Sequence, residues 1–326
     1  MKKKRGGVFA AGALFIMYLF SYNSCASFGA SPEEYYSIGM AYFELGKFEE
    51  AERWLNRAKA ADKTKIASEY NLGRIAFETG RYGEAAAIFD RILARDPNNT
   101  MALKAAAYTR IKTGELEKAE QYYQRILALI PESADDGYNY ALVLFAIKKF
   151  EETENTLLKN PYALEENKDA LLLYARAQKA QGKVEAVDTY AKFLLNNSDP
   201  KARYEYAQTL EAAELYAKAI EEYRAALNEL SQDSADLKRQ DIRFGLARAL
   251  LIADGENPEG LTELEGAVSS DFTDIEALEN LAADEKLSPA NRERIQDIIS
   301  KMKQDAAEDD EALETEAEAG SDEPKE

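Results

Sequence analysis

PEEYYSIGMAYFELGKFEEAERWLNRAKAADK, residues 32–63, is followed by a second stretch of the same pattern, IASEYNLGRIAFETGRYGEAAAIFDRILARDP, residues 66–97. Counted from its first residue, each stretch has glycine at positions 8 and 15, an aromatic residue at 17, alanine at 20 and a bulky apolar residue at 24. The glycine of position 15 returns every 34 residues as Gly46, Gly80 and Gly114, and two periods later as Gly182. A 34-residue period is typical of stacked helical hairpins, each too small to bury its own apolar face.

Each position of the pattern has a physical reason. Glycine at position 15 can adopt the left-handed conformation that ends a first helix. Pro97 and Pro131, at position 32, lack an N–H group and stop the second helix. Small residues at positions 8 and 20 let the two helices of a hairpin approach closely. Ser31 and Glu34 around Pro32 are typical of a helix N-cap with a capping box.

These residues resemble the tetratricopeptide repeat family over residues 32–303. The units begin at Pro32, Ile66, Thr100, Ala134 and Lys168, and two further units begin at about Pro200 and Asp241. The resemblance implies an all-α fold, a right-handed superhelical solenoid of about seven helical hairpins with a C-terminal capping hairpin at residues 275–303. The unit from Ala134 departs from the pattern, because Lys148 replaces the glycine and Asn160-Pro161 cuts the second helix short.

The first 25 residues differ from the repeats. A basic start, MKKKR, precedes an apolar run from Val8 to Phe20, which is the layout of a secretory signal. Cys25, the only cysteine, looks like the lipid-attachment cysteine of bacterial lipoproteins, although Tyr22-Asn23-Ser24 depart from the common Leu-Ala-Gly pattern. Cleavage after Ala26 or Ala30 and an uncleaved anchor helix are the alternatives. Residues 26–31 are expected to form a short linker.

Charge also sets the C-terminus apart. Residues 305–326 contain eleven acidic residues and one lysine, so residues 304–326 are expected to form a disordered acidic tail. The chain has a net charge of −19, and without Lys2, Lys3, Lys4 and Arg5 the charge is −19 − 4 = −23. This balance argues against binding to nucleic acid, which needs clusters of lysine and arginine.

The composition gives little support to catalysis. The chain has no histidine, which excludes Ser-His and Cys-His nucleophile pairs and histidine-containing metal sites. Its glycines follow the repeat and form no phosphate-binding loop. We expect no enzymatic activity, no catalytic residue, no metal and no cofactor.

In the tetratricopeptide repeat family, the first helices of successive units line a concave face. Positions 5, 9 and 12 of a helix share one side, because they are four and three residues apart. The residues predicted to form a partner-binding groove here are Tyr36, Met40, Phe43, Tyr70, Arg74, Phe77, Lys104, Tyr108, Tyr138, Phe145, Arg176 and Tyr204. Tyrosine on such a face offers a large contact area at low entropic cost.

Two alternatives stay open for this face. The position-12 aromatics, such as Phe77 and Phe145, could pack into the core, because position 11 often lacks a bulky apolar residue. Arg74, Lys104 and Arg176 could form ion pairs with neighbouring helices or meet carboxylates of a partner. A carboxylate clamp of the kind that some family members use is not supported, because only Asn71 of the five clamp positions matches.

The sequence therefore predicts an exported scaffold on the periplasmic side of a bacterial envelope, anchored to a membrane by a lipid at its N-terminus. Its partner is a protein or peptide held on the concave face, and self-association is left open. The alternative is an accessory subunit of an envelope transport or outer-membrane assembly system, which would dock a transporter or bind a small apolar ligand.

Overall fold

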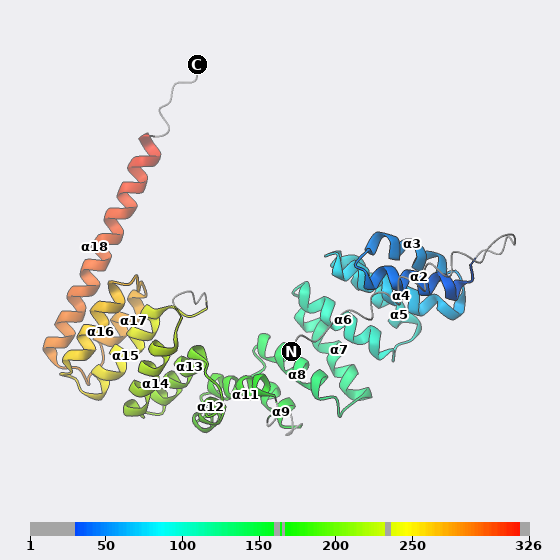
Figure 1. The fold of residues 1–326 in the computed structure, drawn as a ribbon. Coiled ribbons are helices and arrows are strands. Elements are labelled where there is room, and N and C mark those ends of the chain that lie inside the picture. The colour runs from blue at the N-terminus through cyan, green and yellow to red at the C-terminus, as the bar shows by residue number, and fades with distance from the viewer. Residues whose placement is uncertain (1–29, 160–163, 165–166, 232–235, 320–326) are drawn as a thin grey trace, which may run out of the picture. The chain divides into compact units, whose positions relative to one another are not determined.

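The computed structural model describes residues 30–159, 164, 167–231 and 236–319, and these residues form sixteen α-helices. The chain divides into two compact units, residues 1–129 and residues 130–326. The described helices pair into consecutive hairpins in both units (Figure 1). No strand occurs among the described residues, so the all-α prediction is confirmed.

The first unit contains three hairpins. Their helices are α2 (Pro32–Glu44), α3 (Phe48–Ala58), α4 (Asp62–Glu78), α5 (Tyr82–Arg95), α6 (Thr100–Lys112) and α7 (Leu116–Leu129). The hairpins pack on one another in chain order, and the first helix α4 also contacts both α2 and α6 directly.

The second unit contains five hairpins. Their helices are α8 (Ala134–Ala146), α9 (Phe150–Leu158), α11 (Lys168–Ala180), α12 (Ala186–Leu194), α13 (Pro200–Ala212), α14 (Tyr216–Glu229), α15 (Arg239–Ala253), α16 (Pro258–Val268), α17 (Ile275–Ala282) and α18 (Pro289–Ala319). The array of seven hairpins and a closing hairpin is the one that the sequence predicts. The short α9 ends at Leu158, just before Asn160-Pro161.

At several helix starts, a side chain accepts a hydrogen bond from a free backbone N–H group. The Ser31 side chain accepts a hydrogen bond from the Glu34 N–H, and the Glu34 carboxylate accepts one from the Ser31 N–H, so the predicted capping box is present. Asn99 and Asp199 cap α6 and α13 in the same way. The Ser288 hydroxyl accepts from Asn291 N–H at the start of α18, as the Ser288-Pro289 pair predicts.

The turn inside each of the first six hairpins contains one residue in the left-handed conformation. Glycine occupies this place in four hairpins, with φ of 70° at Gly46, 76° at Gly80 and Gly114, and 68° at Gly182. Lys148 and Glu214 occupy it in the other two, with φ of 62° and 58°. The backbone requirement is therefore kept where the glycine is lost.

Close packing between the two helices of a hairpin depends on the small residue at position 8. A Cβ atom on Gly73 would lie 2.6 Å from the ring of Phe89, and one on Gly39 would lie 2.8 Å from Leu55. Phe89 and Leu55 occupy position 24 and are buried. The position-8 glycine thus leaves room for the bulky side chain of position 24.

The structure differs from the sequence-based boundaries at two places. Helix α4 begins at Asp62 rather than at Ile66, because the first repeat has Lys63 where the second and third repeats have a closing proline. Helix α18 continues to Ala319, so residues 304–319 are helical where a disordered tail is expected. Alanine and glutamate are strong helix formers, which favours this extension. Residues 320–326 lie outside the described residues.

The predicted signal segment and Cys25 also lie outside the described residues, as do residues 26–29 of the linker. Among the helices that are described, none has the length and apolar character needed to cross a membrane.

We expect the left-handed turn residue to control stability in opposite directions at two positions. Gly114→Ala should lower the unfolding free energy by about 1 kcal/mol, because an L-residue is strained at this φ. Lys148→Gly should raise the unfolding free energy by about 0.5–1 kcal/mol, because glycine relieves the strain but loses more entropy on folding. Urea denaturation followed by circular dichroism measures both changes.

Gly137→Ala is the matched control, since Gly137 lies in α8 and a Cβ atom there meets nothing within 4 Å. This change should stabilise the protein by about 0.5–1 kcal/mol through helix propensity alone. A destabilising Gly137→Ala, or a neutral Gly114→Ala, would contradict the assignment.

Candidate functional site

The predicted groove residues divide between the two units. Those from Tyr36 to Tyr108 lie in the first unit, and Tyr138, Phe145, Arg176 and Tyr204 lie in the second. Ten of the twelve are partly buried, and Lys104 and Tyr108 are exposed. We call positions 5, 9 and 12 of the first helices, together with Met101 on the same side of α6, the first-helix face, and each unit has its own.

In the first unit, polar and aromatic contacts join α2 to α4. The buried Asn71 amide donates a hydrogen bond to the Tyr36 hydroxyl over 3.1 Å, and its oxygen accepts one from Arg74 at 3.1 Å. The Arg74 guanidinium lies over the Phe43 ring, 4.4 Å from its centre, in a cation–π contact. Met40 packs on the core below them. Tyr36, Phe43 and Arg74 are thereby held in one arrangement.

Aromatic rings continue the face from α4 to α6. The Phe77 and Tyr108 ring centres are 5.2 Å apart, and Tyr70 packs at 5.8 Å on the ring of Phe89. Tyr108 has half of its surface exposed, and Met101, about two turns earlier on α6 at position 2, is 60% exposed. The face of α6 thus presents two large side chains to solvent.

The position-12 aromatics close the hairpins from inside. Each packs against the aromatic residue that starts the second helix of the same hairpin. The ring centres are 5.7 Å apart for Phe43–Phe48, 5.2 Å for Phe77–Tyr82 and 5.2 Å for Phe145–Phe150. These rings therefore pack inside the hairpin, as the alternative of core packing predicts, but each is still partly exposed.

This pairing could have been found in the sequence. The three repeats with an aromatic residue at position 12 also have one at position 17, whereas the third repeat has the aliphatic pair Ile111 and Leu116. The Asn71 link to Tyr36 and the exposed Met101 were missed as features of the face. Met101 precedes Lys104 by three residues, so its helix position was the available signal.

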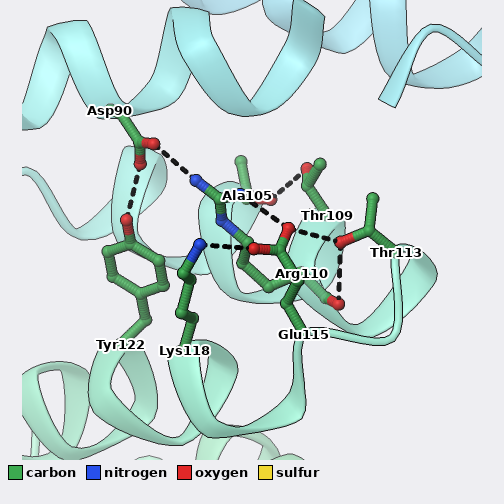
Figure 2. A network of polar contacts seen from close by, with 8 residues as sticks. All are labelled: Asp90, Ala105, Thr109, Arg110, Thr113, Glu115, Lys118 and Tyr122. Atoms are coloured by element: carbon green, nitrogen blue, oxygen red, sulfur yellow. Dashed lines mark hydrogen bonds and ion pairs between the residues drawn. The ribbon is translucent and has the colours of Figure 1, made fainter. Parts of the chain in front are cut away.

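A network of ion pairs and hydrogen bonds joins α6 to its neighbours α5 and α7 (Figure 2). Arg110 stands at position 11, where the second, fourth, fifth and sixth repeats have a buried residue. It donates to Asp90 of α5 at 2.5 Å and to Glu115 at 2.7 Å. The Tyr122 hydroxyl of α7 donates to the other Asp90 oxygen at 2.5 Å. The Arg110 side chain is only 13% exposed, so solvent screens its ion pairs less than surface pairs. The network joins α5, α6 and α7.

Glu115 accepts hydrogen bonds from three neighbours in this network. Hydrogen bonds from Lys118, Arg110 and Thr113 lower the pKa of the Glu115 carboxyl to about 2. The charged carboxylate is therefore the form that the fold favours.

In the second unit, the first-helix face is more polar. Arg176 of α11 pairs with Glu205 of α13 at 2.8 Å, so the expected ion pair with a neighbouring helix is present. Lys179 donates to Gln208 at 2.6 Å, the next link between the same helices.

The tyrosines of the second unit are partly covered by the core. Tyr138, together with Phe145, packs on the cluster around Ala141 and Leu173, and Tyr204 packs on the Tyr223 ring at 5.8 Å. Burial raises the pKa of Tyr138 and of Tyr204, and the negative charges of Asp169 and Asp241 respectively add to it. Both hydroxyls thus remain neutral and able to donate.

Comparison with protein families identifies repeats at three places. Models described as tetratricopeptide repeat match residues 32–65, 70–134 and 169–199. These stretches contain the units in which the sequence pattern is clearest, together with the unit from Lys168. No curated protein matches the sequence.

Solved structures show the same fold over more of the chain. A tetratricopeptide repeat protein from Parabacteroides merdae ATCC 43184 is 20% identical, with a TM-score of 0.53, and the match covers 78% of this chain and 98% of that one. YrrB, described as a TPR protein with an unusual peptide-binding site, is 18% identical, with a TM-score of 0.50, and the match covers 55% of this chain and 93% of that one. At these identities the likeness shows the fold alone.

We expect Glu115 to make stability depend on acid. Its pKa in the folded protein lies below the ordinary value of 4.5, so its contribution is complete above about pH 4.5 and is lost as the pH falls toward 2. Glu115→Gln should flatten this part of the stability profile, measured as urea midpoints between pH 2.5 and 6. Glu117→Gln, an exposed change on α7, should leave the profile as it is. An unchanged slope in Glu115→Gln would disprove the assignment.

Proposed function

We propose that this chain, which carries tetratricopeptide repeats, is an exported and lipid-anchored scaffold that binds a segment of a partner protein on its first-helix face. The observation that carries the proposal is the face of α6 and its neighbours in the first unit. There Tyr108 is half exposed, beside the half-buried Phe77. Large side chains that are already held in place lose little entropy on binding.

The surroundings of Tyr108 have the composition of a binding hot spot. Aromatic residues and arginine dominate such places, and a partly polar rim surrounds them. Here Arg74, Asn71 and Tyr36 offer donors and acceptors next to apolar rings. The ready arrangement favours a short segment with an apolar anchor, and YrrB is a precedent for peptide binding by a repeat protein of this fold.

Export and anchoring are supported by the sequence of the first 25 residues. MKKKR, the apolar run from Val8 to Phe20 and the single cysteine Cys25 follow one another in the order of a lipoprotein signal. We propose the periplasmic side of a bacterial membrane as the location. A single lipid at Cys25 would leave the whole repeat array on the aqueous side.

Photo-crosslinking tests the proposed face. A benzophenone amino acid at position 108 should capture a protein partner in intact envelopes, identified by mass spectrometry, because Tyr108 is half exposed on the face of α6. Met101→Ser in the same chain should reduce this product several-fold. The circular dichroism spectrum should stay unchanged, since Met101 is largely exposed.

The control removes other exposed apolar residues of the first unit. Leu45 and Leu129 are 65% and 41% exposed, and neither belongs to the first-helix face. Leu45→Ser with Leu129→Ser should leave the crosslink at position 108 intact. The proposal fails if this control reduces the product as much as Met101→Ser does, or if position 108 gives no product while position 45 does.

Lipidation is tested at Cys25. The mature protein should begin at Cys25 and carry a diacylglyceryl mass on that residue, and Cys25→Ser should move the protein from the membrane to the soluble fraction. The reason is that the proposed lipid on Cys25 is what would hold the mature chain at the membrane. Mass spectrometry of the mature N-terminus and fractionation of envelopes measure the two effects. A mature N-terminus at Cys25 that lacks the diacylglyceryl mass would rule out the lipid anchor.

A further inference from the structure

A hollow of about 410 Å³ opens on the first-helix face of the second unit. Tyr204 and Gln208 of α13 line one side, and Asp241, Phe244 and Arg248 of α15 line the floor. The start of α17 and the turn before it complete the wall with Asp271, Phe272 and Asp274. The volume lies in the range of about 300–1,000 Å³ that is usual for ligand sites.

The aromatic part of the wall is rigid. Phe244 and Phe272 stack with ring centres 4.4 Å apart and an interplanar angle of 15°. Both rings are buried in the core of the last two hairpins. The hollow therefore has a fixed apolar base from which its polar groups project.

The one arginine of the hollow is already neutralised. Arg248 donates to both oxygens of Glu211, at 3.1 and 2.7 Å, and Glu211 also accepts a hydrogen bond from the Tyr223 hydroxyl. The hydrogen bonds that Arg248 donates to Glu211 raise the pKa of Arg248, against the effect of its burial. Arg248 thus contributes no unpaired positive charge to a ligand.

The remaining charges are mostly negative. Asp241, Asp271 and Asp274 face only one further cation, Lys238, among the residues that line the hollow. Asp274 accepts a hydrogen bond from the Ala277 N–H at 2.9 Å and caps α17. Asp241 has no hydrogen-bond or ion-pair partner for its side chain among the described residues.

The surroundings of Asp241 disfavour its charged form. Burial raises the pKa of Asp241, Lys238 lowers it in part, and the negative charge of Asp274 raises it again. A cation placed between Asp241 and Asp274 would offset both effects. In the described part of the chain, no group of three or more carboxylates is arranged to hold a metal ion.

We infer that this hollow is a subsite for one basic side chain, arginine or lysine, of the bound partner segment, an inference that rests on the proposed function. The side chain would lie with its apolar stem along Tyr204 and the Phe244–Phe272 stack, and its charge between Asp241 and Asp274. An arginine or lysine carries a long apolar stem behind its charge, which matches this order of apolar and acidic walls. The charge requirement is opposite in sign to that of a carboxylate clamp.

The first test uses a probe that needs no partner protein. N-acetyl-arginine amide is titrated into the full-length protein and followed by amide NMR signals of Gln208, Gly245 and Thr273, which line the hollow. We expect saturable shifts with this probe. N-acetyl-citrulline amide, which has nearly the same shape without the charge, should give none. Equal shifts from both probes, or arginine shifts located elsewhere only, would overturn the inference.

Variants of matched charge locate the subsite. Asp241→Asn with Asp274→Asn should weaken the arginine probe about tenfold, since both carboxylate charges are lost while asparagine still caps α17. Glu293→Gln with Asp297→Asn changes the net charge by the same amount on the exposed side of α18 and should leave the affinity within about twofold. Equal weakening in both double variants would reduce the effect to overall charge and overturn the inference.

Lys238→Ala tests whether the hollow prefers a positive or a negative ligand, and this test stays informative if the double variant does not fold. It removes the one cation that competes for Asp241, so the arginine probe should bind about threefold more tightly. Weaker binding would show that the hollow prefers an anion and would end the proposal. A missing crosslink at position 108 together with intact probe binding would remove the scaffold function and leave the cation subsite standing.

Discussion

One left-handed residue at the turn of each of the first six hairpins is the constraint on which that part of the described array depends. Gly46, Gly80, Gly114 and Gly182 have it at no steric cost, and a Cβ atom there would meet nothing within 4 Å. Lys148 and Glu214 keep the same conformation with a side chain. Because the turn angle is a backbone property, the reversal of the chain survives the loss of glycine, and the second helix still returns along the first.

Once the turn is fixed, two kinds of contact complete the structure. Inside a hairpin, an aromatic pair such as Phe77–Tyr82 closes the end near the turn, and Gly73 admits the ring of Phe89. Between hairpins, partly buried ion pairs such as Arg110–Asp90 and Arg176–Glu205 join successive units. The contacts inside a hairpin are apolar and hold its two helices together. The ion pairs between hairpins are directional and determine how neighbouring hairpins pack on each other.

The periodic part of this arrangement could be predicted from the sequence, and the part between repeats could not. The helix starts at Pro32, Thr100, Ala134, Lys168 and Pro200 follow from spacing and capping residues, which act within a few residues of chain. The bond from Asn71 to Tyr36 and the position of Arg110 between Asp90 and Glu115 depend on how two hairpins pack. The hollow beside Asp241 lies where the seventh repeat departs from the 34-residue period, so the period did not indicate which of its residues lie side by side.

The first-helix face differs between the units for a reason that lies in the same positions. At position 12 the first unit has Phe43 and Phe77, whereas the fifth and sixth repeats have Lys179 and Glu211. The rings of the first unit offer apolar contact. In the later repeats, Lys179 donates a hydrogen bond to Gln208 and Glu211 is paired with Arg248, so neither charge is available to a ligand. What remains for a ligand there is the surplus of carboxylates around Asp241. A partner that used both faces would therefore need an apolar anchor for one and a basic side chain for the other.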